Sequence, residues 1–308
     1  MILELSLESV FAVVDMYFVS HLKENANADF SKKTIANDEK ISKLQYFQKN
    51  GVNPDLKKPK EFMEKTQWLK LYYYTQKYGK YVDKYEVRSF IEHKIGNKYL
   101  NEIIGVYDSV SQINFNNLPK QFVLKGTHGS GYNIIVKDKS KLEINKTKKK
   151  LNQFLSDNYY YKFRELIYKD VQPRILIEKY ISEIDSDSLI DYKFHCFHGE
   201  PKYVFVQKTT TNGIKKGFYD LNWKKVMPEK YVSSFSDVEF DKPANFDEMI
   251  EVAKKLSEGF IFLRVDLYSI ENKIIFGELT FFSTAGNIRS SIERFNIEFG
   301  DLIKLPSL

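Results

Sequence analysis

The first segment that could do chemistry is a lysine at the start of a glycine-rich turn. Residues 122–136 read FVLKGTHGSGYNIIV, so an apolar run leads into Lys125 and a second apolar run follows the turn. Gly126, Gly129 and Gly131 permit positive φ angles and let backbone N–H groups approach an anion closely. In a P-loop the lysine would instead precede a helix. The pattern predicts a phosphate-binding hairpin, and a plain glycine-rich hairpin is the alternative.

The second candidate is a pair of apolar runs near the C-terminal end, Ile261–Tyr268 and Lys273–Phe281. Side chains alternate between the two faces of a strand, so the polar residues of each run share one face. These polar residues are Arg264, Asp266, Glu278 and Thr280. Burying charged groups is costly unless they are paired or bind something charged. Carboxylate oxygens suit a Mg²⁺ ion that bridges phosphates. The pair predicts a metal and phosphate site, with a salt-bridged sheet surface as the alternative.

The two carboxylates can hold the same ion only if both project from one face of neighbouring antiparallel strands. Placing Asp266 opposite Glu278 leaves a three-residue loop at 271–273. A two-residue turn would oppose Asp266 to Gly277 and send the carboxylates to opposite faces. We expect the odd-length loop, because the connection lacks the Asn-Gly or Asp-Gly pair that favours two-residue turns.

Two further segments place charged residues at strand spacing. Residues 174–181 form an apolar run with a polar end at Glu178 and Lys179. In the run that starts near residue 190, Asp191 and Lys193 share one face. Neither segment specifies a chemistry by itself.

The elements that must position these residues follow from the hydrophobic pattern. Helical spacing precedes a body dominated by strands, which favours an α+β fold over a regular βαβ winding. The polar stretch 23–60 is expected to form surface loops and short helices. We expect helices over 61–81, 84–96, 147–169 and 245–258, and strands over 103–107, 122–125, 133–136, 174–181, 192–197, 203–207, 261–268 and 273–281.

Composition excludes several classes of protein. The 308 residues carry a net charge of +6, and 43% of them are apolar, so the chain can bury a core and is not broadly disordered. One cysteine allows no disulfide framework, which favours a reducing compartment. The apolar run at 10–19 is too short to cross a bilayer, and Glu4 and Glu8 precede it where a secretory signal would be basic. We expect a helix packed on the body, with a membrane-surface helix as the alternative, in a soluble cytoplasmic protein.

Residues 137–150 include seven lysines among fourteen residues. A solvated loop and helix face would explain them. The alternative is a basic rim that attracts an anionic polymer, in a manner that salt would weaken. No nucleic-acid motif accompanies the lysines, so we expect no nucleic acid as a partner.

Taken in order, these motifs resemble the ATP-grasp superfamily, and more closely its teichuronopeptide-biosynthesis, or TupA-like, branch. The resemblance runs from about residue 40 to the C-terminal end and rests on five separated motifs. They are PKEFMEKTQWLK at 59–70, DKxxxR at 83–88, the LP and FVLKGTHGSG pieces within 118–131, DYKF at 191–194, and FxRVDLY with FGELTF within 262–281.

The resemblance implies a fold and its division. An ATP-grasp fold has two α+β lobes that clamp ATP, and the glycine-rich hairpin is a lid over the phosphates. By this likeness residues 1–110 form a mostly helical N-terminal region, 111–182 the lid lobe, and 183–308 the C-terminal lobe with the metal site.

The resemblance also implies which residues bind ATP. Arg88 and Lys125 take the places of the two phosphate-binding lysines, and Asp191 is the ribose contact. The strand end at 178–181 holds adenine. The full implied set is Arg88, Lys125, Gly129, Ser130, Gly131, Glu178, Lys179, Ile181 and Asp191.

At the reaction centre, the resemblance implies two catalytic cations. Arg264 steadies the negative charge of acyl transfer, and Lys193 contacts a phosphate or carboxylate. Asp266 and Glu278 match the Mg²⁺ ligands. Thr280 takes the third ligand position, where the superfamily more often has Asn.

The implied activity is that of an ADP-forming carboxylate–amine ligase with ATP and Mg²⁺ as cofactors. Its carboxylate is expected on an acidic surface or capsular glycan that contains a uronic acid, and its amine on an amino acid. The pattern leaves two alternatives open, a sugar or small-molecule kinase and a non-catalytic nucleotide-binding partner of a polysaccharide assembly complex. It also leaves open a peripheral contact with a membrane.

Overall fold

The computed structural model describes residues 35–181, 189–210, 213–226, 239–290 and 293–307. The chain divides into two compact units, Met1–Lys40 and Ile41–Leu308. Only residues 35–40 of the first unit are described, and they begin helix α2 (Ile35–Asn50). The helix expected around residues 10–19 lies outside the described residues. In the part of the chain that is described, no helix is both long and apolar enough to cross a membrane.

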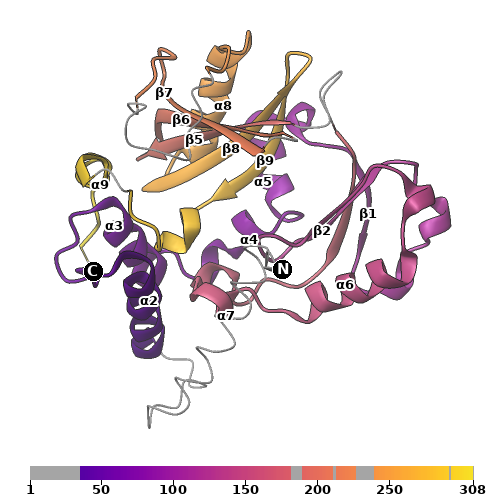
Figure 1. Cartoon of the computed structure of the whole chain (residues 1–308), viewed down its shortest axis with the longest axis horizontal. Coiled ribbons are helices and arrows are strands. Elements are labelled where there is room, and N and C mark those ends of the chain that lie inside the picture. The colour runs from indigo at the N-terminus through magenta and orange to yellow at the C-terminus, as the bar shows by residue number, and fades with distance from the viewer. Residues whose placement is uncertain (1–34, 182–188, 211–212, 227–238, 291–292, 308) are drawn as a thin grey trace, which may run out of the picture. The chain divides into compact units, whose positions relative to one another are not determined.

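A four-stranded antiparallel sheet in the second unit carries the glycine-rich turn. Its spatial order is β1 (Ile103–Tyr107), β4 (Ile175–Lys179), β2 (Phe122–Gly126) and β3 (Asn133–Val136). The turn joins β2 to β3. Helix α6 (Ile144–Ser156) packs on the sheet through Leu151 and Phe154 (Figure 1). The sheet includes β1, which comes from the segment that the resemblance assigns to the helical region.

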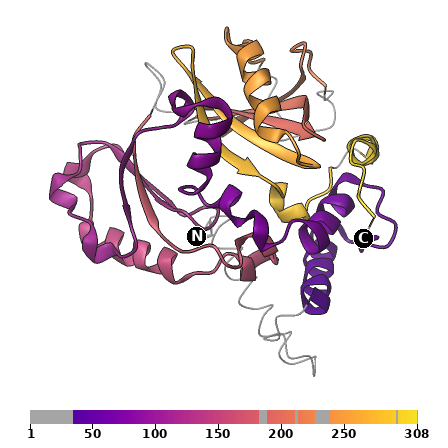
Figure 2. The same cartoon turned by 180° about the vertical axis from the view of Figure 1, so that it is seen from behind.

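A five-stranded antiparallel sheet carries the charged residues of the C-terminal hairpin. Its order is β7 (Gly213–Asp220), β6 (Glu200–Thr210), β5 (Ile190–Phe197), β8 (Phe262–Ile270) and β9 (Lys273–Thr280). Helix α8 (Phe246–Ser257) covers one face of it, as both views show (Figures 1 and 2).

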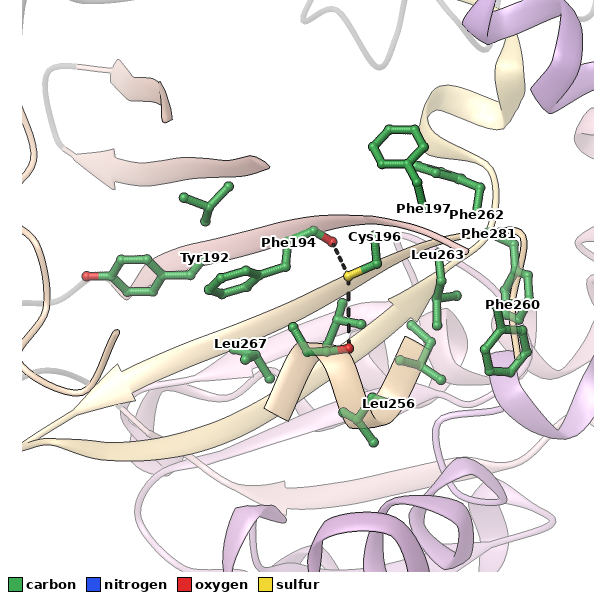
Figure 3. Close-up of a cluster of buried hydrophobic side chains, with 14 of the residues drawn as sticks. Tyr192, Phe194, Cys196, Phe197, Leu256, Phe260, Phe262, Leu263, Leu267 and Phe281 are labelled. Carbon is green, nitrogen blue, oxygen red and sulfur yellow. Dashed lines mark hydrogen bonds between the residues drawn. The ribbon is translucent and has the colours of Figure 1, made fainter. Parts of the chain in front are cut away.

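The covered face forms the larger hydrophobic core. Figure 3 shows Phe194 and Cys196 of β5 and Leu263 and Leu267 of β8 on this face, close to Leu256 of α8, and all five are fully buried. Because side chains alternate along a strand, the polar residues between them must project from the other face. The core therefore fixes the direction of the polar side chains.

The remaining helices pack around the sheets. Helix α3 (Phe62–Trp68) continues directly into a π-helix, Leu69–Tyr73. The others are α4 (Gly79–Val82), α5 (Val87–Ile95), α7 (Tyr160–Phe163) and α9 (Glu293–Asp301). Single 3₁₀ turns lie at Gln76–Tyr78, Asn97–Tyr99, Val110–Gln112, Phe115–Asn117, Lys139–Lys141, Leu166–Tyr168 and Ser283–Gly286.

All eight expected strands are present, with ends that differ by a few residues, but four expectations are wrong. Strand β7 was not expected, because it is an edge strand that buries only its C-terminal half. The stretch 23–60 contains the 16-residue helix α2. The helix expected over 147–169 ends at Ser156, since Asp157 is extended and Arg164 is left-handed. The helix expected over 61–81 breaks after the π-helix, at Tyr74.

Candidate functional site

A cleft of about 900 Å³ lies between the two sheets of the second unit, and residues from both line it. The four-stranded sheet and its turn contribute Lys125, Ser130, Gly131, Glu178, Lys179 and Ile181. The five-stranded sheet contributes Asp191, Lys193, Asp266 and Glu278. The structure thus brings most of the predicted ATP-binding residues to one cleft. Among the predicted site residues, Arg88, Gly129, Arg264 and Thr280 do not line it.

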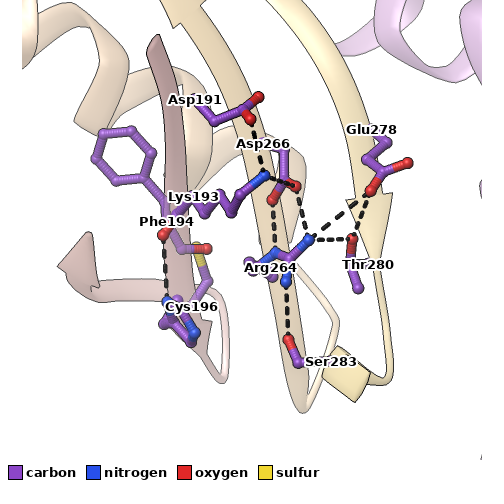
Figure 4. Close-up of polar contacts among 10 residues, drawn as sticks. Asp191, Lys193, Phe194, Cys196, Arg264, Asp266, Glu278, Thr280 and Ser283 are labelled. Atoms are coloured by element: carbon purple, nitrogen blue, oxygen red, sulfur yellow. Dashed lines mark hydrogen bonds and ion pairs between the residues drawn. The ribbon is translucent and has the colours of Figure 1, made fainter. Parts of the chain in front are cut away.

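The Arg264 guanidinium is the centre of the polar network on the five-stranded sheet (Figure 4). Its Nε and Nη2 each donate to a different carboxylate oxygen of Asp266, both at 2.7 Å. Nη2 also donates to Thr280 Oγ1 at 3.1 Å and lies 3.7 Å from Glu278 Oε1. Nη1 donates to Ser283 Oγ at 3.0 Å. Burial disfavours both charges, but the attraction between them outweighs the cost of burial. The pairing therefore raises the pKa of Arg264 and lowers the pKa of Asp266.

Lys193 is the second cation of this network. Its Nζ lies 3.3 Å from Asp266 Oδ2 and 3.4 Å from Asp191 Oδ2. Burial raises the pKa of Asp191, while the Lys193 ammonium acts in the opposite direction. One sheet face therefore carries Arg264 and Lys193 against three carboxylates, those of Asp191, Asp266 and Glu278. Such a face is suited to bind charged groups rather than apolar ones.

The carboxylates of Asp266 and Glu278 fit a magnesium ion that is held together with a nucleotide. They lie directly opposite each other on β8 and β9, and both line the cleft. In the described ranges no group of three or more His, Cys, Asp or Glu side chains is placed to hold a metal ion by itself. Mg²⁺ in such sites takes only one or two carboxylates and completes its shell with substrate phosphates and water. Thr280 donates to Glu278 Oε1 at 3.3 Å and so orients that carboxylate.

The hairpin that carries these carboxylates corrects one expectation. Ile270 pairs with Lys273, so the turn has two residues, Glu271 and Asn272, both left-handed at φ 50° and 62°. The expected three-residue loop is wrong. A β-bulge beside Asp266 restores the opposition to Glu278, a possibility that counting loop residues does not include.

Lys125 and Arg88 both contact Glu178, at the edge of the cleft. Lys125 Nζ lies 2.6 Å from Glu178 Oε2, and Arg88 Nη1 lies 3.4 Å from Oε1. Arg88 Nη2 also donates to the Asn101 carbonyl at 2.7 Å. Arg88 lines a neighbouring hollow of about 430 Å³ rather than the cleft. Of the two predicted phosphate-binding cations, the cleft therefore holds Lys125.

Lys84 is a cleft residue that the sequence reasoning did not assign. Its ammonium donates to the Gly129 carbonyl of the glycine-rich turn. Burial lowers its pKa, and the nearby Glu278 carboxylate opposes this. Asp83 Oδ1 accepts from the backbone N–H groups of Tyr85 and Glu86 at 2.7 and 2.9 Å, which fixes the direction of the chain at Lys84. In the sequence, the signal for Lys84 is its position directly after Asp83, an aspartate that caps the following turn.

The glycines of the turn are required for two different reasons. Only Gly131 has a positive φ, 79°. A Cβ at Gly126 would lie 2.9 Å from Tyr132 Cβ, and a Cβ at Gly129 would lie 2.6 Å from Tyr132 Cε2. Close packing against the tyrosine, and not backbone conformation, therefore excludes side chains at the first two positions.

Comparisons with known proteins identify the family of the chain. The sequence profile of the family described as TupA-like ATPgrasp matches residues 64–304. No curated protein matches the sequence. Similar solved structures include two D-alanine–D-alanine ligases. The enzyme of Bacillus anthracis has 14% sequence identity and a TM-score of 0.41, and the match covers 72% of this chain and 62% of that chain. The enzyme of Helicobacter pylori has 15% identity and a TM-score of 0.38, and the match covers 73% of this chain and 61% of that chain. Another is an N5-carboxyaminoimidazole ribonucleotide synthetase with 14% identity and a TM-score of 0.41, and the match covers 82% of this chain and 57% of that chain.

The chain spans 57% to 62% of the length of these three structures. The family match covers β1 to β9, and so contains every residue that lines the cleft. It begins at residue 64, later than the resemblance near residue 40 suggested. The chain belongs to the TupA-like ATP-grasp family, and its α+β body has the ATP-grasp fold.

Proposed function

We propose that the protein is an ADP-forming ligase that joins a carboxylate to an amine. The observation that carries the proposal is the Arg264 guanidinium, which lies within 3.7 Å of both Asp266 and Glu278, two carboxylates that line the cleft. Arginine stabilises a developing oxyanion better than a point charge does, because its planar donors fit two oxygens. A cation held beside two metal-type carboxylates suits acyl transfer.

In the proposed reaction, a carboxylate oxygen attacks the γ-phosphorus of ATP, and the bond to the β–γ bridging oxygen breaks to release ADP. The amine then attacks the carbonyl carbon of the acyl phosphate, phosphate leaves, and the amine nitrogen loses its proton to water. Lys84 and Lys125 bind phosphate oxygens. Arg264 and Lys193 stabilise negative charge on the carbonyl and phosphate oxygens. Asp266 and Glu278, the latter oriented by Thr280, would hold Mg²⁺, which would supply neutralisation of phosphate charge when bound.

We place the adenine at the strand end formed by Glu178, Lys179 and Ile181, and the ribose at Asp191, because all four residues line the same cleft. ATP as a co-substrate supports a cytoplasmic reaction. The described residues give no argument for a nucleic-acid partner.

The proposed carboxylate belongs to a uronic acid in an acidic surface or capsular glycan, and the amine to an amino acid. Family membership supports this choice. Basic side chains also surround the cleft, since Lys137, Lys179 and Lys208 line it. The lysines of α6 are exposed as well. An oligomer of uronic acids should therefore bind more tightly than the monomer at low salt, and added salt should remove the difference.

A hydroxylamine trap tests the ligase against its rivals. Full-length protein is incubated with ATP, Mg²⁺, candidate carboxylates and hydroxylamine. A ligase yields a hydroxamate and ADP, because hydroxylamine intercepts the acyl phosphate. A sugar or small-molecule kinase yields a phosphorylated product without hydroxamate, and a non-catalytic nucleotide-binding partner releases no ADP. Asp266→Asn should abolish ADP formation, while Asp247→Asn, a change at an exposed surface carboxylate, should not.

A further inference from the structure

The loop that follows β9 has an unfavourable backbone conformation close to Arg264. Thr284 and Ala285 are both left-handed, at φ 52° and 54°, and Gly286 follows at φ 72°. A Cβ makes this conformation unfavourable, so two such residues in a row persist only when the surroundings hold them. Ser283, which accepts the hydrogen bond from Arg264 Nη1, directly precedes these left-handed residues.

Two buried side chains hold the loop from one side. Gln67 Nε2 donates to the Gly286 carbonyl at 3.0 Å and to Asn287 Oδ1 at 2.7 Å. Lys70 Nζ donates to the Ala285 carbonyl at 3.1 Å. Both residues are 0% exposed. They stand three positions apart where α3 passes into the π-helix, a spacing that places both on one side of the helix.

A fully buried ammonium is a costly way to fill a core position, because desolvation disfavours its charge. An apolar side chain of similar length could fill the same space without that cost. Lys70 also donates to the carbonyl of Phe163, the last residue of α7, at 3.1 Å, so one cation connects the end of α7 to the loop after β9. Lys70 therefore supplies a donor that reaches two carbonyls, and its charge also acts on the buried Glu165, so volume alone does not explain the lysine.

We propose that Gln67 and Lys70 are positioning residues: they hold the Ala285 and Gly286 carbonyls so that Ser283 keeps the Arg264 guanidinium in place. This inference rests on the proposed function only for its catalytic consequence. The chain of contacts runs from Lys70 to Ala285 through a hydrogen bond, from Ala285 along the backbone through Thr284 to Ser283, and from Ser283 to Arg264 through a second hydrogen bond.

The test uses full-length Lys70→Met and Gln67→Met, each of which removes the donor and keeps an unbranched side chain. Lys65→Met is the matched control. Lys65 lies on the same helix and its Nζ also donates to two backbone carbonyls, those of Gly300 and Ile303, both at 2.8 Å, but it does not contact the loop. Circular dichroism first checks that all three variants fold.

Two measurements need no ligase activity. Hydrogen exchange follows the amides of Ala285 and Asn287, which donate to Phe282 and Thr284 within the loop. These amides should exchange roughly tenfold faster in Lys70→Met and Gln67→Met, and at the wild-type rate in Lys65→Met. Modification of Arg264 by phenylglyoxal, read by mass spectrometry, should also be faster in the first two variants alone. Wild-type exchange rates in Lys70→Met and Gln67→Met would overturn the proposal. Faster exchange of the loop amides with unchanged reactivity of Arg264 would overturn it as well.

Hydroxamate formation adds the catalytic measurement. In Lys70→Met and Gln67→Met, kcat should fall roughly tenfold while KM for ATP stays near the wild-type value, since a misplaced guanidinium affects transfer more than nucleotide binding. Combining Lys70→Met with Ser283→Ala should change ln kcat by less than the sum of the two separate changes, because both residues act on Arg264 through the same contacts. Additive changes would show that Lys70 and Ser283 act independently. Absence of hydroxamate in the wild type would refute the ligase, while the exchange and modification results would still decide the positioning role.

Discussion

Asp266 lies directly opposite Glu278 on β8 and β9, although the turn that joins these strands has only two residues. Regular pairing from that turn would place Asp266 against Gly277. Instead Leu267 pairs with Phe276 and Asp266 with Glu278, so Gly277 is the extra residue of a β-bulge. The bulge shifts the register by one residue and returns both carboxylates to the cleft face.

Gly277→Val should disturb the metal site without changing either carboxylate. A Cβ at this position would lie 3.0 Å from the Asp266 carbonyl oxygen and 3.1 Å from Tyr268 Cε2, and a branched side chain adds to the crowding. We expect Glu278 to move and the Mg²⁺-dependent affinity for ATP to fall roughly tenfold, the range seen when the support of a metal ligand is lost. Titration calorimetry with MgATP measures this.

Lys273→Val is the control for Gly277→Val. It lies at the exposed end of the same hairpin and should bind MgATP as the wild type does. A folded Gly277→Val protein with wild-type affinity would show that the bulge does not position Glu278.

Much of the sheet architecture could be predicted from the sequence, because buried strands leave a period of two in their apolar residues. In β8, the alternation of Leu263, Val265 and Leu267 assigned Arg264 and Asp266 to the opposite face, and the structure confirms it. Strand β7 left a weak pattern because an edge strand packs on one side only.

The parts that could not be predicted depend on backbone detail or on tertiary contacts. A bulge inserts one residue without a distinctive side chain, so Gly277 gave no signal of its register shift. Lys84 and Arg88 both follow Asp83 in one motif, and only the folded chain shows that the cleft holds Lys84 and the neighbouring hollow holds Arg88. A buried lysine such as Lys70 has the same sequence signature as an exposed one.

Lys84→Met should weaken ATP binding more than Arg88→Met. A hydrogen bond to a charged group contributes about 1.5 to 3 kcal/mol, so losing a phosphate contact at Lys84 should raise KM for ATP by roughly 10- to 100-fold. Arg88 contacts Glu178 and the Asn101 carbonyl, and its loss should act only indirectly. Steady-state ADP release at varied ATP compares the two. The reverse order would restore Arg88 as the phosphate-binding cation.

Glu165→Gln should change how stability depends on pH. Burial raises the pKa of Glu165 from 4.5 to about 8, although the Lys70 ammonium acts in the opposite direction. Between these values the unfolded chain has released the proton and the folded chain retains it, so the free energy of unfolding falls as pH rises. The variant lacks this penalty. It should gain roughly 3 to 4 kcal/mol over the wild type between pH 5 and pH 8.

Denaturant unfolding at several pH values measures the difference between Glu165→Gln and the wild type. Glu143→Gln, a change at an exposed carboxylate, should follow the wild type throughout. A difference that stays constant from pH 5 to pH 8 would mean that Glu165 is already ionised in the folded chain.

Arg264→Lys should lower kcat by at least roughly 100-fold and leave ATP binding nearly unchanged, because an ammonium cannot reproduce the planar contact to a developing oxyanion. In the structure the guanidinium uses three nitrogens on Asp266, Thr280 and Ser283, and a lysine could keep only part of that set. Arg289→Lys is the matched control. It changes an equally two-pronged arginine–carboxylate pair, in which two Arg289 nitrogens each lie 2.5 Å from a Glu61 oxygen. If Arg264→Lys bound ATP poorly but turned over normally, the arginine would stabilise the Asp266 carboxylate and take no part in transfer.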